Sequence, residues 1–345
     1  MKIVILGAGA IGCYLGAALK AGGLAPTLIA RPRVIADIHQ AGGLTISDYQ
    51  EEQWQVGTPD MTDSNEALAD ADIVLLTVKC LAVEESAQLL HQYCKAGTLV
   101  LCLQNGLGSD AIIKRICPTL NIVRGIVGFN VAPLGEGRFH RGTEGAIYCE
   151  PNDTIRAALT SAFAKTNIQL LSNSDYEAIV WAKLQLNLNN AINALSGLPL
   201  KTELEHVGYR RILSAAMTEL LVVAKAKNLN LPKLTRLPAR WLPPLMNFPD
   251  WLFKKLAASM LAIDPQARSS MWEDLHLGRL TEVEYLNGAV VKAASKLGID
   301  TPVNAALCTL IHQVEHHQRH EGLSSSEIEK AIKKEKKKIE QKKGR

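Results

Sequence analysis

The chain has 345 residues, of which 47% are hydrophobic and 21% are charged, and its formal net charge is +4. This length predicts two domains with separate cores, and no apolar run approaches the roughly 20 residues that a membrane-spanning helix needs. The first apolar run lacks the charged region and cleavage site of a secretory signal, so a cytoplasmic location is expected.

The cysteines predict reduced, buried thiols. Their number is odd, they are scattered, and none belongs to a Cys-x-x-Cys pair, which argues against a disulfide framework and against a metal or redox site. They stand at Cys13, Cys80, Cys94, Cys102, Cys117, Cys149 and Cys308.

The chain opens with an apolar run at residues 1–6 that leads directly into a glycine-rich turn. The turn reads Gly7, Ala8, Gly9, Ala10, Ile11, Gly12, and small, helix-compatible residues follow it. A strand, this turn and a helix form a dinucleotide-binding fingerprint: Gly7 permits the tight turn, Gly9 lets a pyrophosphate approach, and Gly12 allows close helix packing. The phosphates would bind free N–H groups at the helix N-terminus. A glycine-rich turn without a ligand is the alternative.

A second strand is predicted at residues 27–30, and Arg31 ends it. In dinucleotide-binding folds an acid at this position holds the ribose hydroxyl of NAD, whereas an arginine accommodates the 2′-phosphate of NADP. Because Arg31 and Arg33 stand here without an acid, the sequence favours NADPH, and a surface arginine is the alternative.

Two near-continuous apolar strands are predicted at residues 72–79 and 98–106, as in a buried parallel sheet. Lys79 and Asn105 follow their apolar cores. Ligands bind beyond the carboxyl ends of such strands, so both residues are candidate cofactor contacts.

The remaining pattern of the first half alternates helices with strands. Helices are predicted at 81–93 and 109–116, and later strands at 122–127, 145–149 and 168–171. Residues 1–173 are therefore predicted to form a doubly wound parallel α/β sheet of the Rossmann type that binds NADP.

From residue 174 to 322 the pattern predicts an all-helical second domain that binds substrate. Its first helix, expected at 175–195, places Lys183, Asn187 and Asn190 on one face. A lysine among apolar neighbours is costly to bury unless it has partners or a task, so Lys183 is a candidate catalytic residue. A lysine that extends to the surface is the alternative.

Residues 281–288 contain a second polar constellation. Thr281 and Glu284 fit a capping box that opens a helix, which gives Glu284 a structural role. Glu282 then remains as a first-turn acid at the helix dipole or as a carboxylate directed into a cleft between the domains.

Two further features receive no catalytic role. His312, His316 and His320 have helical spacing but no acidic or cysteine ligand, so exposed helix histidines are favoured over a metal site. The segment 238–253, rich in proline and tryptophan, predicts a packed hairpin or an interface.

The tail at 323–345 is predicted to be disordered or a frayed helix. Its last sixteen residues hold nine Lys or Arg against two Glu, and the body without them has 29 basic and 32 acidic residues. A solvated tail is favoured over a nucleic-acid contact.

In order and over nearly the whole chain, these motifs resemble the ketopantoate reductase (2-dehydropantoate 2-reductase) family. The matching blocks are Gly7 to Gly12, Thr77-Val78-Lys79, Asn105-Gly106-Leu107-Gly108, Trp181-Ala182-Lys183-Leu184 with Asn187, Ser269-Ser270-Met271 with Asp274, and Glu282-Val283-Glu284-Tyr285-Leu286-Asn287-Gly288. The resemblance implies reduction of ketopantoate to (R)-pantoate by NADPH, in pantothenate and coenzyme A biosynthesis.

The resemblance also implies roles for individual residues. Lys183 corresponds to the general acid, and Glu282 to the carboxylate that orients the lysine, the substrate and the cofactor. Further cofactor contacts are implied at Arg31, Lys79, Asn105 and Val131, and substrate contacts at Asn105, Lys183, Asn187, Asn190 and Ser270. The family's second substrate asparagine aligns with Ala191, which leaves Asn190 and Asn193 as candidates to replace it.

Two other functions stay open at this point. One is a related NADP-dependent reductase of another 2-keto acid or of an imine, and the other is a non-enzymatic NADP-binding sensor. The expected partner is a small 2-keto acid, with no nucleic acid and no membrane, and the resemblance leaves both a monomer and a homodimer open.

Overall fold

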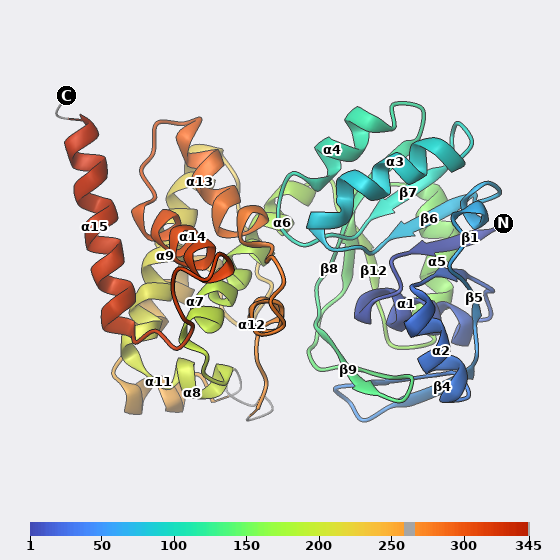
Figure 1. Cartoon of the computed structure of the whole chain (residues 1–345), viewed down its shortest axis with the longest axis horizontal. Helices are drawn as coiled ribbons and strands as arrows, with labels where there is room; N and C mark the ends of the chain where they lie inside the picture. Colours follow the sequence, from blue (N-terminus) through green and yellow to red (C-terminus); the bar gives the residue numbers. More distant parts are fainter. Residues whose placement is uncertain (259–265, 344–345) are drawn as a thin grey trace. The chain divides into compact units, whose positions relative to one another are not determined.

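The computed structural model describes residues 1–258 and 266–343. The chain forms two compact units, Met1–Tyr176 and Glu177–Arg345 (Figure 1). No helix in these described ranges is both long and apolar enough to cross a membrane.

The first unit is built on an eight-stranded sheet with the order β12-β11-β8-β7-β6-β1-β2-β5. Its strands are β1 (Ile3–Leu6), β2 (Thr27–Ile29), β5 (Asp60–Thr62), β6 (Ile73–Leu76), β7 (Leu99–Cys102), β8 (Asn121–Val127), β11 (Ile147–Cys149) and β12 (Leu170–Ser172). Neighbouring strands are parallel except β11, which runs antiparallel to β8. The predicted α/β fold class is confirmed, with a mixed rather than an all-parallel sheet.

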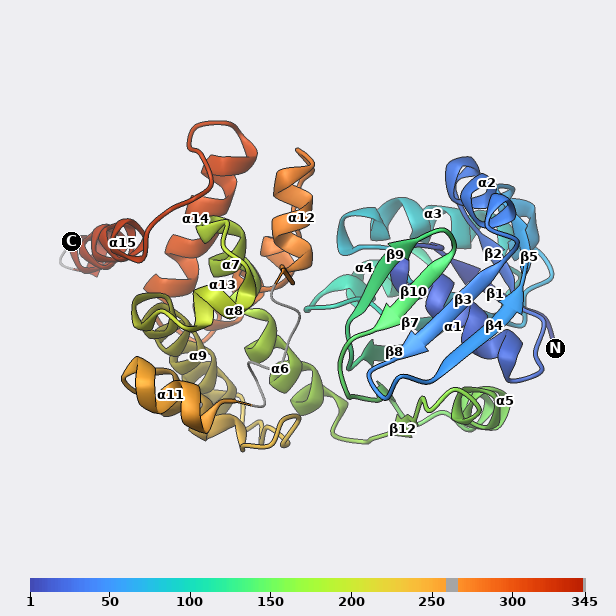
Figure 2. The same cartoon turned by 90° about the horizontal axis from the view of Figure 1, so that it is seen from below.

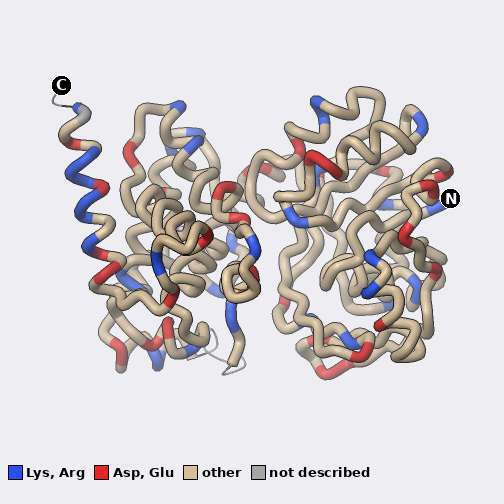
Figure 3. The backbone as a smooth tube through the Cα atoms, in the orientation of Figure 1, with Lys and Arg blue, Asp and Glu red and all other residues tan. Residues whose placement is uncertain are grey.

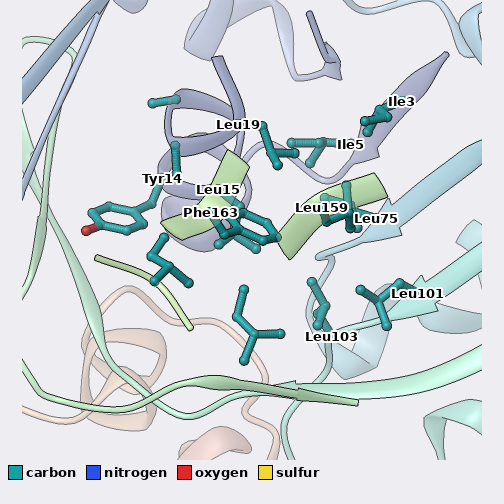
Figure 4. Close-up of a cluster of buried hydrophobic side chains, with 14 of the residues drawn as sticks. Ile3, Ile5, Tyr14, Leu15, Leu19, Leu75, Leu101, Leu103, Leu159 and Phe163 are labelled. Carbon is teal, nitrogen blue, oxygen red and sulfur yellow. The ribbon is translucent and has the colours of Figure 1, made fainter. Parts of the chain in front are cut away.

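Helices cover both faces of this sheet. They are α1 (Ala10–Ala21), α2 (Pro32–Gln40), α3 (Val83–Tyr93), α4 (Ser109–Ile116) and α5 (Asp153–Ala164). Because side chains alternate along a strand, Ile3 and Ile5 of β1 join the core beneath α1 and α5 (Figure 4), whereas Val4 and Leu6 join the core beneath α3 and α4.

A second, four-stranded sheet was not predicted from the sequence. It contains β3 (Leu44–Asp48), β4 (Gln53–Gly57), β9 (Val131–Gly135) and β10 (Arg138–Arg141), in the order β4-β3-β10-β9 (Figure 2). The strands β3 and β10, about ninety residues apart in the chain, pair in parallel. All four strands of this sheet lie against α1.

The second unit is helical throughout its described residues. Its helices are α6 (Tyr176–Asn187), α7 (Asn189–Ser196), α8 (Leu200–Leu204), α9 (Val207–Ala226), α10 (Leu242–Met246), α11 (Asp250–Leu256), α12 (Ser270–His276), α13 (Asn287–Ser295), α14 (Pro302–Glu315) and α15 (Ser325–Lys343). The long helix α9 packs against α7, α8, α10, α13, α14 and α15 and so forms the centre of the unit.

The segment 238–253 forms the short helices η3 (Ala239–Trp241) and α10 and enters α11, so of its two predicted states, a packed hairpin or an interface, the hairpin is wrong. Arg210 of α9 is fully buried, and its guanidinium donates to the carbonyl of Phe248 at 2.6 Å and pairs with Asp250 at 2.8 Å. Together with Ser214 of α9, which donates to the carbonyl of Pro243, this side chain holds the segment against α9.

Of the two states predicted for the C-terminal tail, disorder or a frayed helix, the structure has a helix. Residues Ser325–Lys343 form α15, which packs on α14 and α9 and contains Lys residues at many positions along its length (Figure 3). Ile328 and Ile332, one helical turn apart, are buried with Leu323. A narrow apolar stripe is enough here because α9 and α14 supply the rest of the contact.

The seven cysteines are free thiols, and all but Cys94 are buried. The histidines differ from the expectation of an exposed helical row, because α14 ends at Glu315 and His317 has a left-handed backbone with φ 55°. His312 is half-buried and bonds to two glutamates, Glu284 and Glu315. Within the described residues, no group of three or more His, Cys, Asp or Glu side chains is arranged to hold a metal ion.

Candidate functional site

The glycine turn after β1 has the backbone that the fingerprint predicts. Gly7 has φ 104°, and a Cβ there would lie 2.7 Å from the backbone nitrogen of Val78. A Cβ on Gly12 would lie 2.3 Å from the carbonyl oxygen of Gly7, so only glycine lets α1 approach the turn this closely. A Cβ on Gly9 would meet no atom within 4 Å, so the backbone there faces open space.

The N-terminus of α1 is suited to an anion. Gly9 is its N-cap residue and provides no capping side chain, and the first turn contains no acid. The first-turn N–H groups, those of Ala10, Ile11 and Gly12, have no carbonyl partner within a helix. Together with the positive end of the helix dipole, they can bind a phosphate beside Gly9.

The predicted cofactor contacts follow neighbouring parallel strands. Gly7, Arg31, Lys79 and Asn105 come after β1, β2, β6 and β7, which lie side by side in the sheet in the order β7-β6-β1-β2. These residues therefore stand at one edge of the sheet, as the position of a ligand site in such folds requires. Arg31, Lys79 and Asn105 are exposed.

Arg31 differs from the arginine two residues later. Arg33 lies 3.8 Å from Asp37 on the same helix, whereas Arg31, just before α2, makes no ion pair with any described residue. The Arg31 side chain is thus exposed to solvent at the end of β2.

Val131 stands apart from the other candidates, since it is the first residue of β9 in the smaller sheet. The strand before it, β8, is parallel to β7, so the chain reaches Val131 from the same sheet edge. The side chain of Val131 is partly buried against the core beneath α1.

Gln104 also lies at this edge of the sheet, and the sequence pattern did not identify it as a candidate. Its side-chain amide donates to the carbonyl of Leu76 at 2.7 Å and to that of Val78 at 3.3 Å. The thiol of Cys80 in turn donates to the carbonyl of Asn105 at 3.0 Å. These bonds fix the loops that bear Lys79 and Asn105, and the only signal in the sequence was a polar residue at the end of an apolar strand.

In the second unit, Lys183 lies on α6 among buried apolar residues and has only 8% of its surface exposed. Burial lowers the pKa of this ammonium to about 8. A lysine with this pKa can hold or release a proton near neutral pH, which suits a general acid.

The helix expected at 175–195 is divided into α6 and α7 by Leu188. Asn187 is the last residue of α6 and Asn190 the second of α7, so the three polar residues do not share one continuous helix face as predicted. Both asparagines are half-buried.

The start of α12 is fastened to α7. The backbone N–H of Ser269 donates to Asn193 Oδ1 at 2.8 Å, and its hydroxyl donates to the carbonyl of Asn190 at 3.2 Å. Ser269 also caps α12 by accepting the N–H of Trp272. These bonds place the exposed Ser270 beside the first turn of α7, which brings two of the candidate substrate residues, Ser270 and Asn190, together.

Asn193 has a structural role. Its amide nitrogen donates to the carbonyl of Leu198 at 2.9 Å and to Glu203 Oε2 at 2.7 Å, while its oxygen accepts from Ser269. Glu203 is fully buried, and burial raises the pKa of its carboxyl to about 8. Since the amide of Asn193 is fully engaged, Asn190 is the better candidate for a substrate contact.

The predicted capping box at Thr281 is wrong. Glu284 does not return to the backbone N–H of Thr281, which instead donates to Glu315 Oε1 at 2.7 Å. Glu284 bonds to His312 and Lys292, and α13 begins only at Asn287, after the short helix η4 (Val283–Tyr285). The half-buried Glu282 thus lies in the turn before η4.

The sequence is similar to known proteins over both units. A family model described as ketopantoate reductase PanE/ApbA matches residues 3–154, and one described as the C-terminal part of the same reductase matches 175–315. A 2-dehydropantoate 2-reductase of Halobacterium salinarum is 28% identical over 316 residues, which cover 90% of this chain and 98% of the relative. The enzyme of that name from Archaeoglobus fulgidus is 26% identical, covering 91% and 98%.

Solved structures of other proteins are similar to this chain in fold. A PanE/ApbA family ketopantoate reductase from Ralstonia eutropha is similar with a TM-score of 0.76 and 28% identity, covering 93% of this chain and 100% of that one. A D-mandelate dehydrogenase solved with NADH and anilino(oxo)acetate has a TM-score of 0.74 and 22% identity, covering 92% and 99%. At this identity the second similarity concerns the fold alone.

Proposed function

Because the chain belongs to the ketopantoate reductase family of oxidoreductases, we propose that it reduces 2-dehydropantoate to (R)-pantoate with NADPH. The observation that carries this proposal is the buried Lys183, whose pKa of about 8 suits a proton donor. If the protein were a cofactor-binding sensor without activity, the free-energy cost of burying the Lys183 ammonium would serve no function.

The residues of the first unit fit a nicotinamide dinucleotide. The open backbone at Gly9 and the uncapped start of α1 would hold the pyrophosphate, and Arg31 supports NADPH over NADH. The proposed cofactor contacts are Gly7, Ala8, Gly9, Ala10, Ile11, Gly12, Arg31, Lys79, Asn105, Val131 and Glu282.

When bound, NADPH supplies the hydride that reduces the C2 ketone. As the ketone oxygen gains negative charge, the Lys183 ammonium stabilises it and then donates its proton, which leaves a hydroxyl on the product and a neutral amine on the lysine. Glu282 would orient the lysine. Substrate contacts are proposed for Asn105, Lys183, Asn187, Asn190 and Ser270.

The test is NADPH oxidation by the purified protein with ketopantoate, 2-keto acids of other size, and cyclic imines. The proposal predicts the highest kcat/KM for ketopantoate, and a higher kcat/KM with NADPH than with NADH. A negligible rate with ketopantoate together with turnover of another acid would instead favour the related reductase. Ala191 supports testing that alternative, since this buried residue has no polar group where the family has a substrate asparagine.

A further inference from the structure

The turn that carries Glu282 is held by the end of α14. Glu315, the last residue of α14, has a side chain only 3% exposed. Its Oε1 accepts the backbone N–H of Thr281 at 2.7 Å, and Thr281 is itself buried. Thr281, the residue before Glu282, is thereby fixed to the end of α14.

His312 ties the other side of the same turn. Its Nδ1 lies 2.7 Å from Glu315 Oε2, and its Nε2 lies 3.0 Å from Glu284 Oε1. The second oxygen of Glu284 pairs with Lys292 of α13 at 2.7 Å. Glu282 therefore lies between two anchored residues, Thr281 and Glu284, and both anchors meet at His312.

We infer that His312 and Glu315 are positioning residues for Glu282, and that the doubly bonded His312 braces the turn 281–284 in the geometry that the reaction needs. This inference rests on the proposed function for its kinetic consequences. Neither residue is proposed to touch substrate or cofactor.

The chemistry of imidazole makes this brace sensitive to pH. Both partners of His312 are carboxylates, which only accept, and a protonated imidazole donates from both nitrogens whereas a neutral one donates from one. Burial opposes protonation, but the bonds to Glu284 and Glu315 outweigh it and raise the pKa of His312. When His312 loses its proton, one ring nitrogen faces a carboxylate without a hydrogen, and one side of the brace opens.

The charged and titratable groups around this histidine come from three elements. They are Glu284 of η4, Lys292 of α13, and Glu315 and Cys308 of α14. Glu284 is shared between Lys292 and His312, whereas Glu315 forms an ion pair with His312.

Hydrogen–deuterium exchange tests the brace without any assay of activity. The variants H312Q and E315Q are compared with H140Q, whose histidine bonds to Ser47 in the smaller sheet, and with E335Q on α15. The inference predicts faster deuterium uptake at residues 280–288 in H312Q and E315Q only. Unchanged uptake there would overturn it.

Steady-state kinetics then tests the consequence for catalysis. H312Q is expected to lower kcat about tenfold at pH 6, because a displaced Glu282 no longer orients Lys183 for the reaction. Dividing the kcat of the unmodified protein by that of H312Q at each pH removes the effect of Lys183 titration, which both proteins share. This ratio should fall towards one as the pH rises through the pKa of His312.

A constant kcat ratio from pH 5.5 to 9, or a loss of kcat equal to that in H140Q, would show that His312 has only a structural role. If the unmodified protein does not oxidise NADPH with ketopantoate, the proposed function fails, while the exchange experiment still decides whether the brace exists.

Discussion

Lys183 affects activity and stability in opposite directions. Burial lowers its pKa from 10.5 to about 8, so the folded protein binds fewer protons than the unfolded chain between these values. The free energy of unfolding therefore rises with pH across this window, and at neutral pH the buried ammonium destabilises the fold by about 3 kcal/mol. The proton on that ammonium is the one that the reaction is proposed to use.

Replacing Lys183 with methionine should separate the two effects. K183M is expected to lower kcat by about 10²–10⁴, with a smaller change in NADPH affinity, because it removes the proton donor. At pH 7 its melting temperature should rise, since the cost of burying a charge disappears. Kinetics and thermal unfolding measure both, and an unchanged kcat would contradict the assignment.

In the unmodified enzyme, kcat should fall as the pH rises through about 8.

Arg31 is expected to determine which dinucleotide binds. R31A should weaken NADPH binding by about tenfold or more, because charge-assisted hydrogen bonds to the 2′-phosphate are lost, and should leave NADH affinity within about twofold. Titration of the two dinucleotides by fluorescence measures this difference. R33A is the control, since Arg33 already contacts Asp37. Equal weakening of NADPH and NADH in R31A would show that Arg31 does not read the phosphate.

At the scale of elements, the turn between β1 and α1 distinguishes a glycine needed for folding from one needed for binding. G12A places a Cβ 2.3 Å from the carbonyl of Gly7, so the melting temperature should fall. G9A meets no atom within 4 Å and has an ordinary backbone with φ −84°, so its stability should be unchanged. The new methyl group would still occupy the space of the pyrophosphate, and NADPH affinity should decrease about tenfold or more.

These two variants are compared by thermal unfolding and by NADPH titration. Full NADPH affinity in G9A would show that the phosphates bind elsewhere, and an unchanged melting temperature in G12A would show that α1 can move away from the turn.

The elements of the first unit were predictable where the signal is local. The strand predicted at 72–79 contains the shorter β6, and the helix predicted at 109–116 coincides with α4, because buried parallel strands and helices have distinct periods. The smaller sheet was missed because β3 and β10 stabilise each other only in the fold. Its edge strand β4 is short, and only Trp54 and Val56, which alternate with two glutamines, contact the core.

The same distinction applies to the site. Lys183 could be found because a lysine is conspicuous in an apolar helix. The roles of Gln104 and Asn193 depend on partners that the fold brings to them, such as Leu76 and Glu203. For the same reason the sequence suggested a capping box at Thr281, since the competing acceptor, Glu315, is 34 residues away.

At the scale of the whole molecule, α15 is expected to stabilise the second unit despite its many lysines. Ile328 is fully buried, so I328A should lower the free energy of unfolding by about 2–4 kcal/mol. K337A, at an exposed position of the same helix, is the control and should have little effect. Chemical denaturation measures both changes. Equal stability of the two variants would indicate that α15 does not contribute to the core.

The parallel pairing of β10 with β3 also has a consequence for synthesis of the chain. Residues 45–48 can pair with the nearby β4, but they gain their second neighbour only when residues 138–141 have emerged, and the edge strand β12 ends only at Ser172. Closing such long loops costs entropy before any contact repays it, so the first unit cannot fold progressively as it leaves the ribosome. Nascent chains arrested before residue 138 is exposed should be digested readily by protease, and those that expose residue 172 should resist. Until then the part of the sheet face that α5 covers in the folded unit stays uncovered.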